Sequence, residues 1–120
     1  MIMKSALWLG ALLLAGQTMA ATPAATRAEV AQLMTAVEKS GCKFSRNGSW
    51  YSGAEARAHL QKKFDYLDKK DMLTTAESFI EKGASTSSMS GKPYEMQCAG
   101  MKQVTSAEWL TAELKRLRQK

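Results

Sequence analysis

The dipeptide Asn47-Gly48 lies between two short runs of β-prone residues and restricts the local topology of this chain more tightly than any other part of its sequence. Both residues accept the positive φ angles that a two-residue hairpin turn requires, and Asn-Gly is the strongest short-range signal for such a turn. We therefore predict a β-hairpin centred on this dipeptide. The expected cross-strand pairs are Arg46 with Ser49, Ser45 with Trp50, and Phe44 with Tyr51.

A third strand and the two cysteines extend this hairpin into a sheet. The predicted strand Tyr94–Cys98 places apolar side chains at alternate positions, as a half-buried strand does. We expect it to lie antiparallel beside residues 42–46, in a register that satisfies the apolar faces and joins the cysteines in one disulfide. In that register Cys98 faces Cys42, Met96 faces Phe44, and Tyr94 faces Arg46, whose guanidinium can then stack on the tyrosine ring.

The first 20 residues predict export. One positive charge at Lys4 precedes the apolar run Ala6–Ala15, and Thr18 and Ala20 place small residues where a signal peptidase requires them. The run is too short for the roughly 20 residues that cross a bilayer, so we expect cleavage after Ala20 and no membrane anchor. The mature protein, residues 21–120, is then a single soluble domain in the periplasm or outside the cell. An oxidising compartment favours the disulfide over two alternatives, a zinc site with His59 and a reactive thiol.

Four helices are predicted from apolar residues at helical spacing, the first from about Arg27 to Lys39 and the third ending at Gly83. Each begins with a capping-box pattern, namely Thr26 with Glu29, Ser52 with Glu55, Thr74 with Glu77, and Thr105 with Glu108. Their expected buried faces are Val30, Leu33, Met34 and Val37; Ala56, Leu60, Phe64 and Leu67; Ala76, Phe79 and Ile80; and Trp109, Leu110, Leu114 and Leu117. The predicted class is α+β, with a small antiparallel sheet of about three strands packed against about four helices.

Four segments of the predicted domain share the sequence pattern of a known family. They are Phe44–Gly48, Glu55–Leu60, Thr75–Lys82 and Ala84–Tyr94. In this order and at this spacing, they resemble the YfeK-like family of small exported bacterial proteins, and the resemblance covers most of residues 21–120. It implies a periplasmic protein for which no activity is established.

The residues that carry chemistry argue against most enzyme classes. The chain has one histidine and two cysteines, and His59 lies beside the apolar face of its predicted helix, where we interpret it as a packing or capping residue. The loop before Lys92 does not match a phosphate-binding loop, because Thr86 and Pro93 occupy positions that require glycine and Ser/Thr. We expect no catalytic residue, cofactor or metal site. A deep pocket containing His59 or Arg46 would instead favour an enzyme, and a small hydrolase is kept as a second alternative.

The predicted function is that of a non-enzymatic binding module of the cell envelope, acting as a monomer. The net charge of +6 attracts an acidic protein or an anionic envelope polymer, whereas nucleic acid is not expected in that compartment. Trp50 can either pack on a helix or stack on a sugar ring. The candidate partner-binding residues come from the hairpin and from a serine-rich loop of unusual composition, and they are Arg46, Asn47, Trp50, Ser87, Ser88, Ser90 and Lys92.

The segment Ser90-Gly91-Lys92-Pro93-Tyr94 supports an alternative function. It resembles a loop of periplasmic lysozyme inhibitors, in which a serine and a basic residue enter the carboxylate-lined cleft of the muramidase. Hydroxyl and ammonium donors suit a cleft that holds two carboxyl groups. Those inhibitors are β-barrels, so the expected α+β fold would have to present the same loop on a different scaffold.

Overall fold

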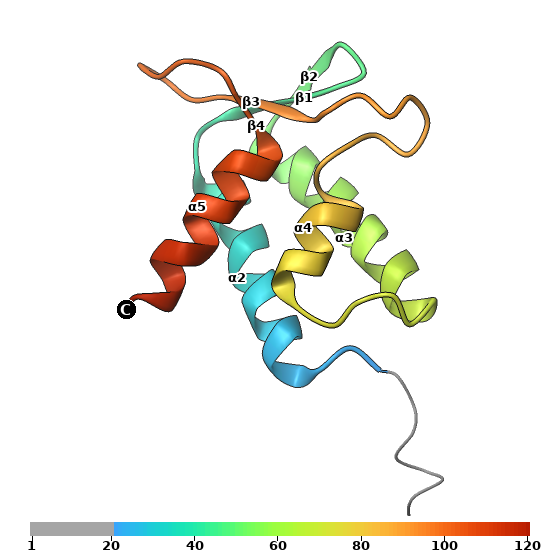
Figure 1. Cartoon of the computed structure of the whole chain (residues 1–120). Helices are drawn as coiled ribbons and strands as arrows, with labels where there is room; N and C mark the ends of the chain where they lie inside the picture. The colour runs from blue at the N-terminus through green and yellow to red at the C-terminus, as the bar shows by residue number, and fades with distance from the viewer. Residues whose placement is uncertain (1–20) are drawn as a thin grey trace, which may run out of the picture.

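The computed structural model describes residues 21–120, so the predicted signal peptide at residues 1–20 lies outside the described residues. The helices are α2 (Ala24–Lys39), α3 (Gly53–Lys69), α4 (Ala76–Gly83) and α5 (Ser106–Arg118), and the strands are β1 (Lys43–Arg46), β2 (Ser49–Tyr51), β3 (Glu95–Gln97) and β4 (Val104–Thr105). Figure 1 shows the small sheet at one end of the domain, with the helices packed together beneath it. The predicted α+β class is confirmed.

The sheet has the strand order β2-β1-β3-β4, with antiparallel neighbours. The hairpin has the predicted register, and its turn residues Asn47 and Gly48 have φ angles of 52° and 85°. Met96 lies opposite Phe44, as expected. The sheet nevertheless has four strands and not three, because Val104 pairs with Met96 in a segment predicted to be a connection. A strand of two residues is too short to produce a recognisable alternation in the sequence.

The predicted disulfide is present. Cys42 and Cys98 are joined by an S–S bond of 1.99 Å across a sequence separation of 56 residues. The bond links the segment just before β1 to the residue that follows β3, so it closes the paired ends of two central strands. Because both sulfurs are covalently paired, the zinc site and the reactive thiol are rejected.

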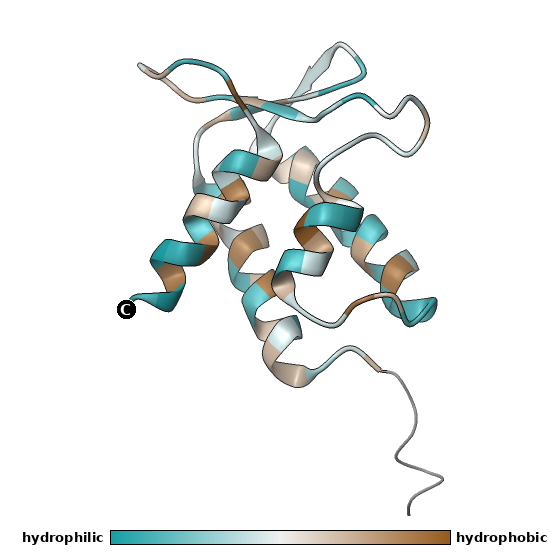
Figure 2. Ribbon diagram, viewed as in Figure 1, coloured by the Kyte–Doolittle hydropathy of each residue, from teal (hydrophilic) through white to brown (hydrophobic). Residues whose placement is uncertain are grey.

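The core lies between the inner face of the sheet and the four helices. α2 is central among the helices and contacts each of the other three. In Figure 2, hydrophobic and hydrophilic residues alternate along α5, as expected for a helix that packs by one face. The predicted helix faces are buried except for Ala56, Trp109 and Leu117, which are only partly buried. Leu73, in the connection between α3 and α4, completes the core and was not predicted.

Three helices begin with side-chain caps. Two of the predicted capping boxes are confirmed, Ser52 with Glu55 at α3 and Thr105 with Glu108 at α5. The box at α4 lies one residue later than predicted, because Thr75 and Ser78 form it in place of Thr74 and Glu77. Ser78 Oγ accepts hydrogen bonds from the backbone N–H groups of both Thr74 and Thr75, at 3.1 and 3.0 Å, and so satisfies two donors at once.

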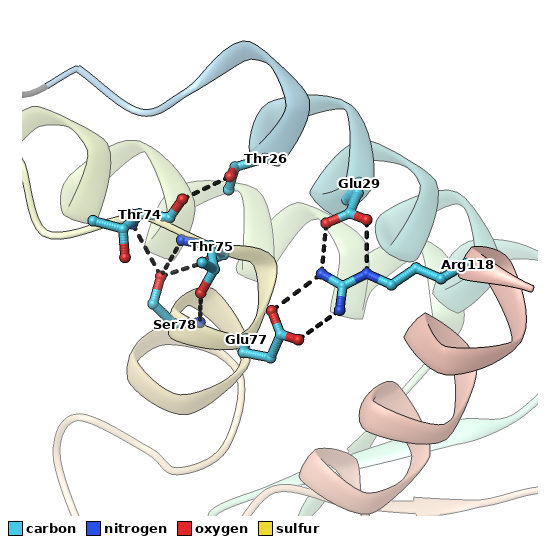
Figure 3. Close-up of polar contacts among 7 residues, drawn as sticks. All are labelled: Thr26, Glu29, Thr74, Thr75, Glu77, Ser78 and Arg118. Atoms are coloured by element: carbon cyan, nitrogen blue, oxygen red, sulfur yellow. Dashed lines mark hydrogen bonds and ion pairs between the residues drawn. The ribbon is translucent and has the colours of Figure 1, made fainter.

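The capping box predicted for α2 is wrong. The helix begins at Ala24, after Pro23, and no side chain caps it. The two residues expected to form the box bind other parts of the chain: Thr26 Oγ1 donates to the carbonyl oxygen of Thr74 at 2.7 Å, and Glu29 pairs with Arg118 (Figure 3). The side chains of Thr26 and Glu29 therefore bind partners distant in sequence, although the local pattern predicted that they cap the start of α2.

Arg118 joins three helices (Figure 3). Its guanidinium lies 2.8 Å from Glu29 of α2 and 2.6 Å from Glu77 of α4, and hydrogen bonds from Arg118 lower the pKa of both carboxyl groups. The C-terminal turn of α5 is thereby fixed against the two helices it covers.

None of the helices within residues 21–120 combines the length and apolar character that a bilayer crossing needs.

Candidate functional site

The hairpin turn and the serine-rich loop lie side by side, as the candidate site requires. Asn47 joins them, because its Nδ2 donates to Ser87 Oγ at 3.1 Å and its Oδ1 accepts from Ser90 Oγ at 2.6 Å. One side-chain amide therefore bonds two hydroxyl groups of a loop 40 or more residues away in sequence. The structure brings the two predicted segments together into one surface.

The serine-rich loop has a defined conformation. Thr86 forms an isolated bridge with Pro93, Ser87 N donates to Lys92 O at 2.9 Å, and Gly91, with a φ of 75°, donates its N–H to Ser87 O at 2.8 Å. Ser87 is only 4% exposed, and its Oγ accepts from the backbone N–H groups that follow it, including that of Met89 at 3.2 Å. Ser87 therefore shapes the loop from within and does not face solvent.

The other loop residues of the candidate site are exposed, namely Ser88, Ser90 and Lys92. Two large apolar side chains accompany them. Trp50, on β2, is 46% exposed, so about half of its surface is accessible to a partner. Met89, which sequence analysis did not single out, is 89% exposed between two serines. Exposed apolar side chains such as these contribute to binding where a partner covers them.

His59, Lys63 and Tyr94 form a polar cluster behind the loop. His59 Nε2 and Tyr94 Oη are 2.9 Å apart, and the two rings meet edge to face. Lys63 Nζ donates to Ser88 Oγ at 2.6 Å and lies 3.4 Å from Tyr94 Oη. Sequence analysis missed Lys63, although its spacing of four residues from His59 places both on one face of α3.

The predicted stacking of Arg46 on Tyr94 is wrong. The Arg46 guanidinium lies over the Tyr51 ring, 5.2 Å from its centre, whereas Lys63 Nζ lies 5.6 Å from the centre of the Tyr94 ring. Tyr51 belongs to the strand that pairs with the strand of Arg46, so the two side chains meet within the hairpin. Tyr94 instead turns its hydroxyl group toward α3, where His59 and Lys63 bind it.

The cluster is neutral at its centre and positive around it. Burial lowers the pKa of His59, and the charges of Arg46, Lys63 and Lys62 lower it further. Burial also raises the pKa of Tyr94. At neutral pH the tyrosine hydroxyl therefore keeps its proton and the imidazole is neutral. Which of the two groups donates across the 2.9 Å contact depends on the tautomer of the imidazole.

The stability of the protein is expected to fall as the pH drops below about 6.5, the ordinary pKa of histidine. Because the pKa of His59 is lower in the folded state, the unfolded chain binds a proton that the folded protein does not, and the fall continues down to the folded-state pKa. Urea unfolding of the wild type between pH 5 and 7.5 measures it. His59 is the single histidine, so His59→Gln should remove this slope; an equal slope in both proteins would contradict the prediction.

A cavity of about 290 Å³ lies between the hairpin, α3 and the start of α5, and both Arg46 and His59 line it. This is the arrangement that sequence analysis associated with an enzyme. Its apolar wall is formed by Val37, Phe44, Ala56, Leu60, Ala84 and Leu110. The imidazole is bonded to Tyr94, and burial raises the pKa of that tyrosine, which disfavours the phenolate at neutral pH.

Within residues 21–120, no three His, Cys, Asp or Glu side chains lie close enough together to hold a metal ion.

Comparison with known proteins identifies relatives but no activity. The sequence pattern of DUF5329, a family of unknown function, matches residues 24–118. The uncharacterized protein YfeK of Salmonella typhimurium strain LT2 is 41% identical over 64 residues, which are 53% of this chain and 52% of the relative. The match thus spans about half the length of that curated relative. No solved structure matches the chain. The predicted YfeK-like family is confirmed.

Proposed function

We propose that this chain, which belongs to the DUF5329 family of unknown function, is a non-enzymatic binding module exported to the cell envelope. One observation carries the proposal: the Asn47 side chain joins the hairpin turn to the serine-rich loop in a single exposed surface. We call this the loop–hairpin surface, and its candidate residues are Arg46, Asn47, Trp50, Ser88, Met89, Ser90 and Lys92.

Two features support the proposed location in the envelope. The Cys42–Cys98 disulfide is of the kind that persists in oxidising compartments such as the bacterial periplasm. The pattern of residues 1–20 is that of a cleaved signal peptide. Both are properties of exported proteins, and they are independent of each other.

The composition of the loop–hairpin surface suits a protein partner. Tryptophan, methionine and arginine are enriched in protein interfaces, and exposed apolar side chains supply most of the binding energy when a partner covers them. Trp50 and Met89 provide such side chains, and Lys92 adds a positive charge. The proposed partner is therefore an envelope protein with an acidic patch around an apolar depression. An anionic polymer would use the charges but leave the two apolar side chains uncovered.

The alternatives are less well supported. A lysozyme inhibitor that acts through this loop needs a serine hydroxyl and a lysine amine together. Ser90 Oγ donates to Asn47 and accepts from the backbone N–H of Lys92 at 3.2 Å, which leaves the amine of Lys92 as the available group. A hydrolase that uses His59 would need its imidazole beside a nucleophile, whereas the imidazole is bonded to Tyr94.

Capture of partners from an envelope extract tests the proposal. The variant Met89→Ser with Lys92→Glu removes an apolar side chain and reverses a charge on the loop–hairpin surface, and is expected to lower the recovery of the partner at least tenfold. Met101→Ser with Lys102→Glu is the matched control, because these residues form a similar exposed pair at another turn. The control should recover the same partner as the wild type.

The proposed surface would be rejected if the loop variant and the control recovered the same partner in equal amounts. A lysozyme assay with the added protein separates the alternative function. Full lysozyme activity at micromolar excess of the protein excludes inhibition, whereas inhibition that Lys92→Glu abolishes would identify the partner as the muramidase.

A further inference from the structure

The cavity beneath the hairpin combines an apolar wall with a cationic rim. Its volume of about 290 Å³ is near the lower end of the range for small-molecule sites, about 300–1,000 Å³. Aliphatic side chains from α2, α3 and α5 and the ring of Phe44 form the wall. Arg46, His59 and Lys62 are the lining residues with nitrogen-containing side chains. Sites of this composition bind a molecule that has an apolar body and a polar end.

Arg46 differs from every other arginine of the chain. There are five arginines, and the four others each pair with a carboxylate: Arg27 with Asp68, Arg57 with Glu38, Arg116 with Glu113, and Arg118 with Glu29 and Glu77. Within residues 21–120, Arg46 has neither an ion pair nor a side-chain hydrogen bond, although it is half-buried over the Tyr51 ring. Stacking fixes the plane of a guanidinium and leaves its N–H groups at the edge available as donors.

The one carboxylate in the cavity lining already has a partner. Glu55 Oε1 accepts from the backbone N–H of Ser52 at 2.9 Å, as part of the cap of α3. The other two charged side chains of the lining, Arg46 and Lys62, are cations. An anion bound beside them is stabilised by their charge.

We propose that this cavity binds a small amphipathic carboxylate, with its carboxyl group on Arg46 and its apolar chain against Phe44, Ala56 and Leu60. Arginine suits the planar carboxylate because it can donate two parallel hydrogen bonds. In the tautomer in which Nε2 accepts from Tyr94, the N–H on His59 Nδ1 is a second donor for the same group. The site shares Arg46 with the loop–hairpin surface but none of its other residues, and it does not depend on the existence of a protein partner.

Calorimetric titration of the full mature chain with sodium octanoate tests this proposal. We expect octanoate to bind, and octanol, with the same chain but no charge, to bind at least tenfold more weakly. Acetate, with the charge but a single methyl group, should show no measurable binding, because it has too little apolar surface to bury. Equal binding of octanoate and octanol, or no binding of octanoate at millimolar concentration, would overturn the proposal.

Two variants test whether Arg46 binds the carboxyl group of octanoate. Arg46→Gln should weaken octanoate at least tenfold, whereas Arg57→Gln, which breaks an ion pair elsewhere on α3, should leave the affinity unchanged. Thermal unfolding of each variant shows that it is folded before it is titrated. Unchanged octanoate affinity in folded Arg46→Gln would refute the assignment.

The same titration separates this site from the partner surface. The variant Met89→Ser with Lys92→Glu, designed to prevent partner capture, should bind octanoate as the wild type does. Loss of octanoate binding in that variant would contradict the separation of the two sites. Failure of partner capture alone would contradict the proposed function but not the proposed cavity site.

Discussion

Loss of the Cys42–Cys98 disulfide is expected to lower the free energy of unfolding by about 4 kcal/mol. The bond closes a loop of 56 residues, and the chain-entropy relation gives about this value for a loop of that length, because the cross-link restricts the unfolded chain. A domain of this size is typically stable by about 5–15 kcal/mol, so the loss removes a large share of the total. Urea unfolding of the oxidised protein and of Cys42→Ala with Cys98→Ala measures the difference.

Added reductant provides the control for this measurement. It should destabilise the wild type and leave the double variant unchanged, since the variant has no bond to reduce. Equal stability of the oxidised wild type and the double variant would contradict the prediction. A destabilised variant that keeps its secondary structure at low urea would show that the sheet register is also specified by its apolar side chains.

The substitution Phe79→Ala is expected to cost about 3–5 kcal/mol, the range for removing a buried aromatic ring. Phe79 is 1% exposed and meets Phe64 of α3 edge to face, with 5.7 Å between ring centres. It is therefore a side chain through which the short helix α4 packs on α3. Removing the ring loses the free energy of its transfer from water to the core, and it also leaves a cavity.

Tyr66→Ala is the matched control for the aromatic substitution. Tyr66 also belongs to α3 but is 60% exposed, so its replacement should change the stability by about 0.5 kcal/mol or less. Urea unfolding measured by circular dichroism compares both variants with the wild type. Similar losses at positions 66 and 79 would show that the buried contact between α3 and α4 is not what stabilises this part of the domain.

Sequence patterns predicted the sheet where local and covalent constraints agree. The turn at Asn47-Gly48 determines the hairpin register, and the alternation of Met96 and Cys98 requires the same pairing as the disulfide. Each signal depends on residues close in sequence or on a bond that only two residues can form. The register, the disulfide and the faces of the helices therefore followed from the sequence.

Features that depend on distant partners could not be predicted from the sequence. Thr26 and Glu29 match a capping box, but Thr74 and Arg118 approach them in the folded protein and bind them instead. The strand at Val104 forms because β3 offers it an open edge, not because of its own pattern. Whether a polar group binds a local or a distant partner depends on how the helices pack. A local sequence pattern carries no information about that packing.

The candidate site was predicted in part for the same reason. Pairing of β1 with β3 already required the serine-rich loop, which precedes β3, to lie near the hairpin turn, and Asn47 makes that contact. Lys63 and the cavity could not be predicted, because both depend on the position of α3 relative to the sheet. The chemical properties of His59 likewise depend on Tyr94, which the sequence places 35 residues away.

The position of α5 has a consequence for the biosynthesis of this protein. Leu110 and Leu114 of α5 complete the core, and Arg118 fastens its last turn to α2 and α4. Until α5 has left the ribosome, one side of α2 stays uncovered, even if the earlier helices have already formed. Folding of this domain can therefore finish only after Arg118 has been translated.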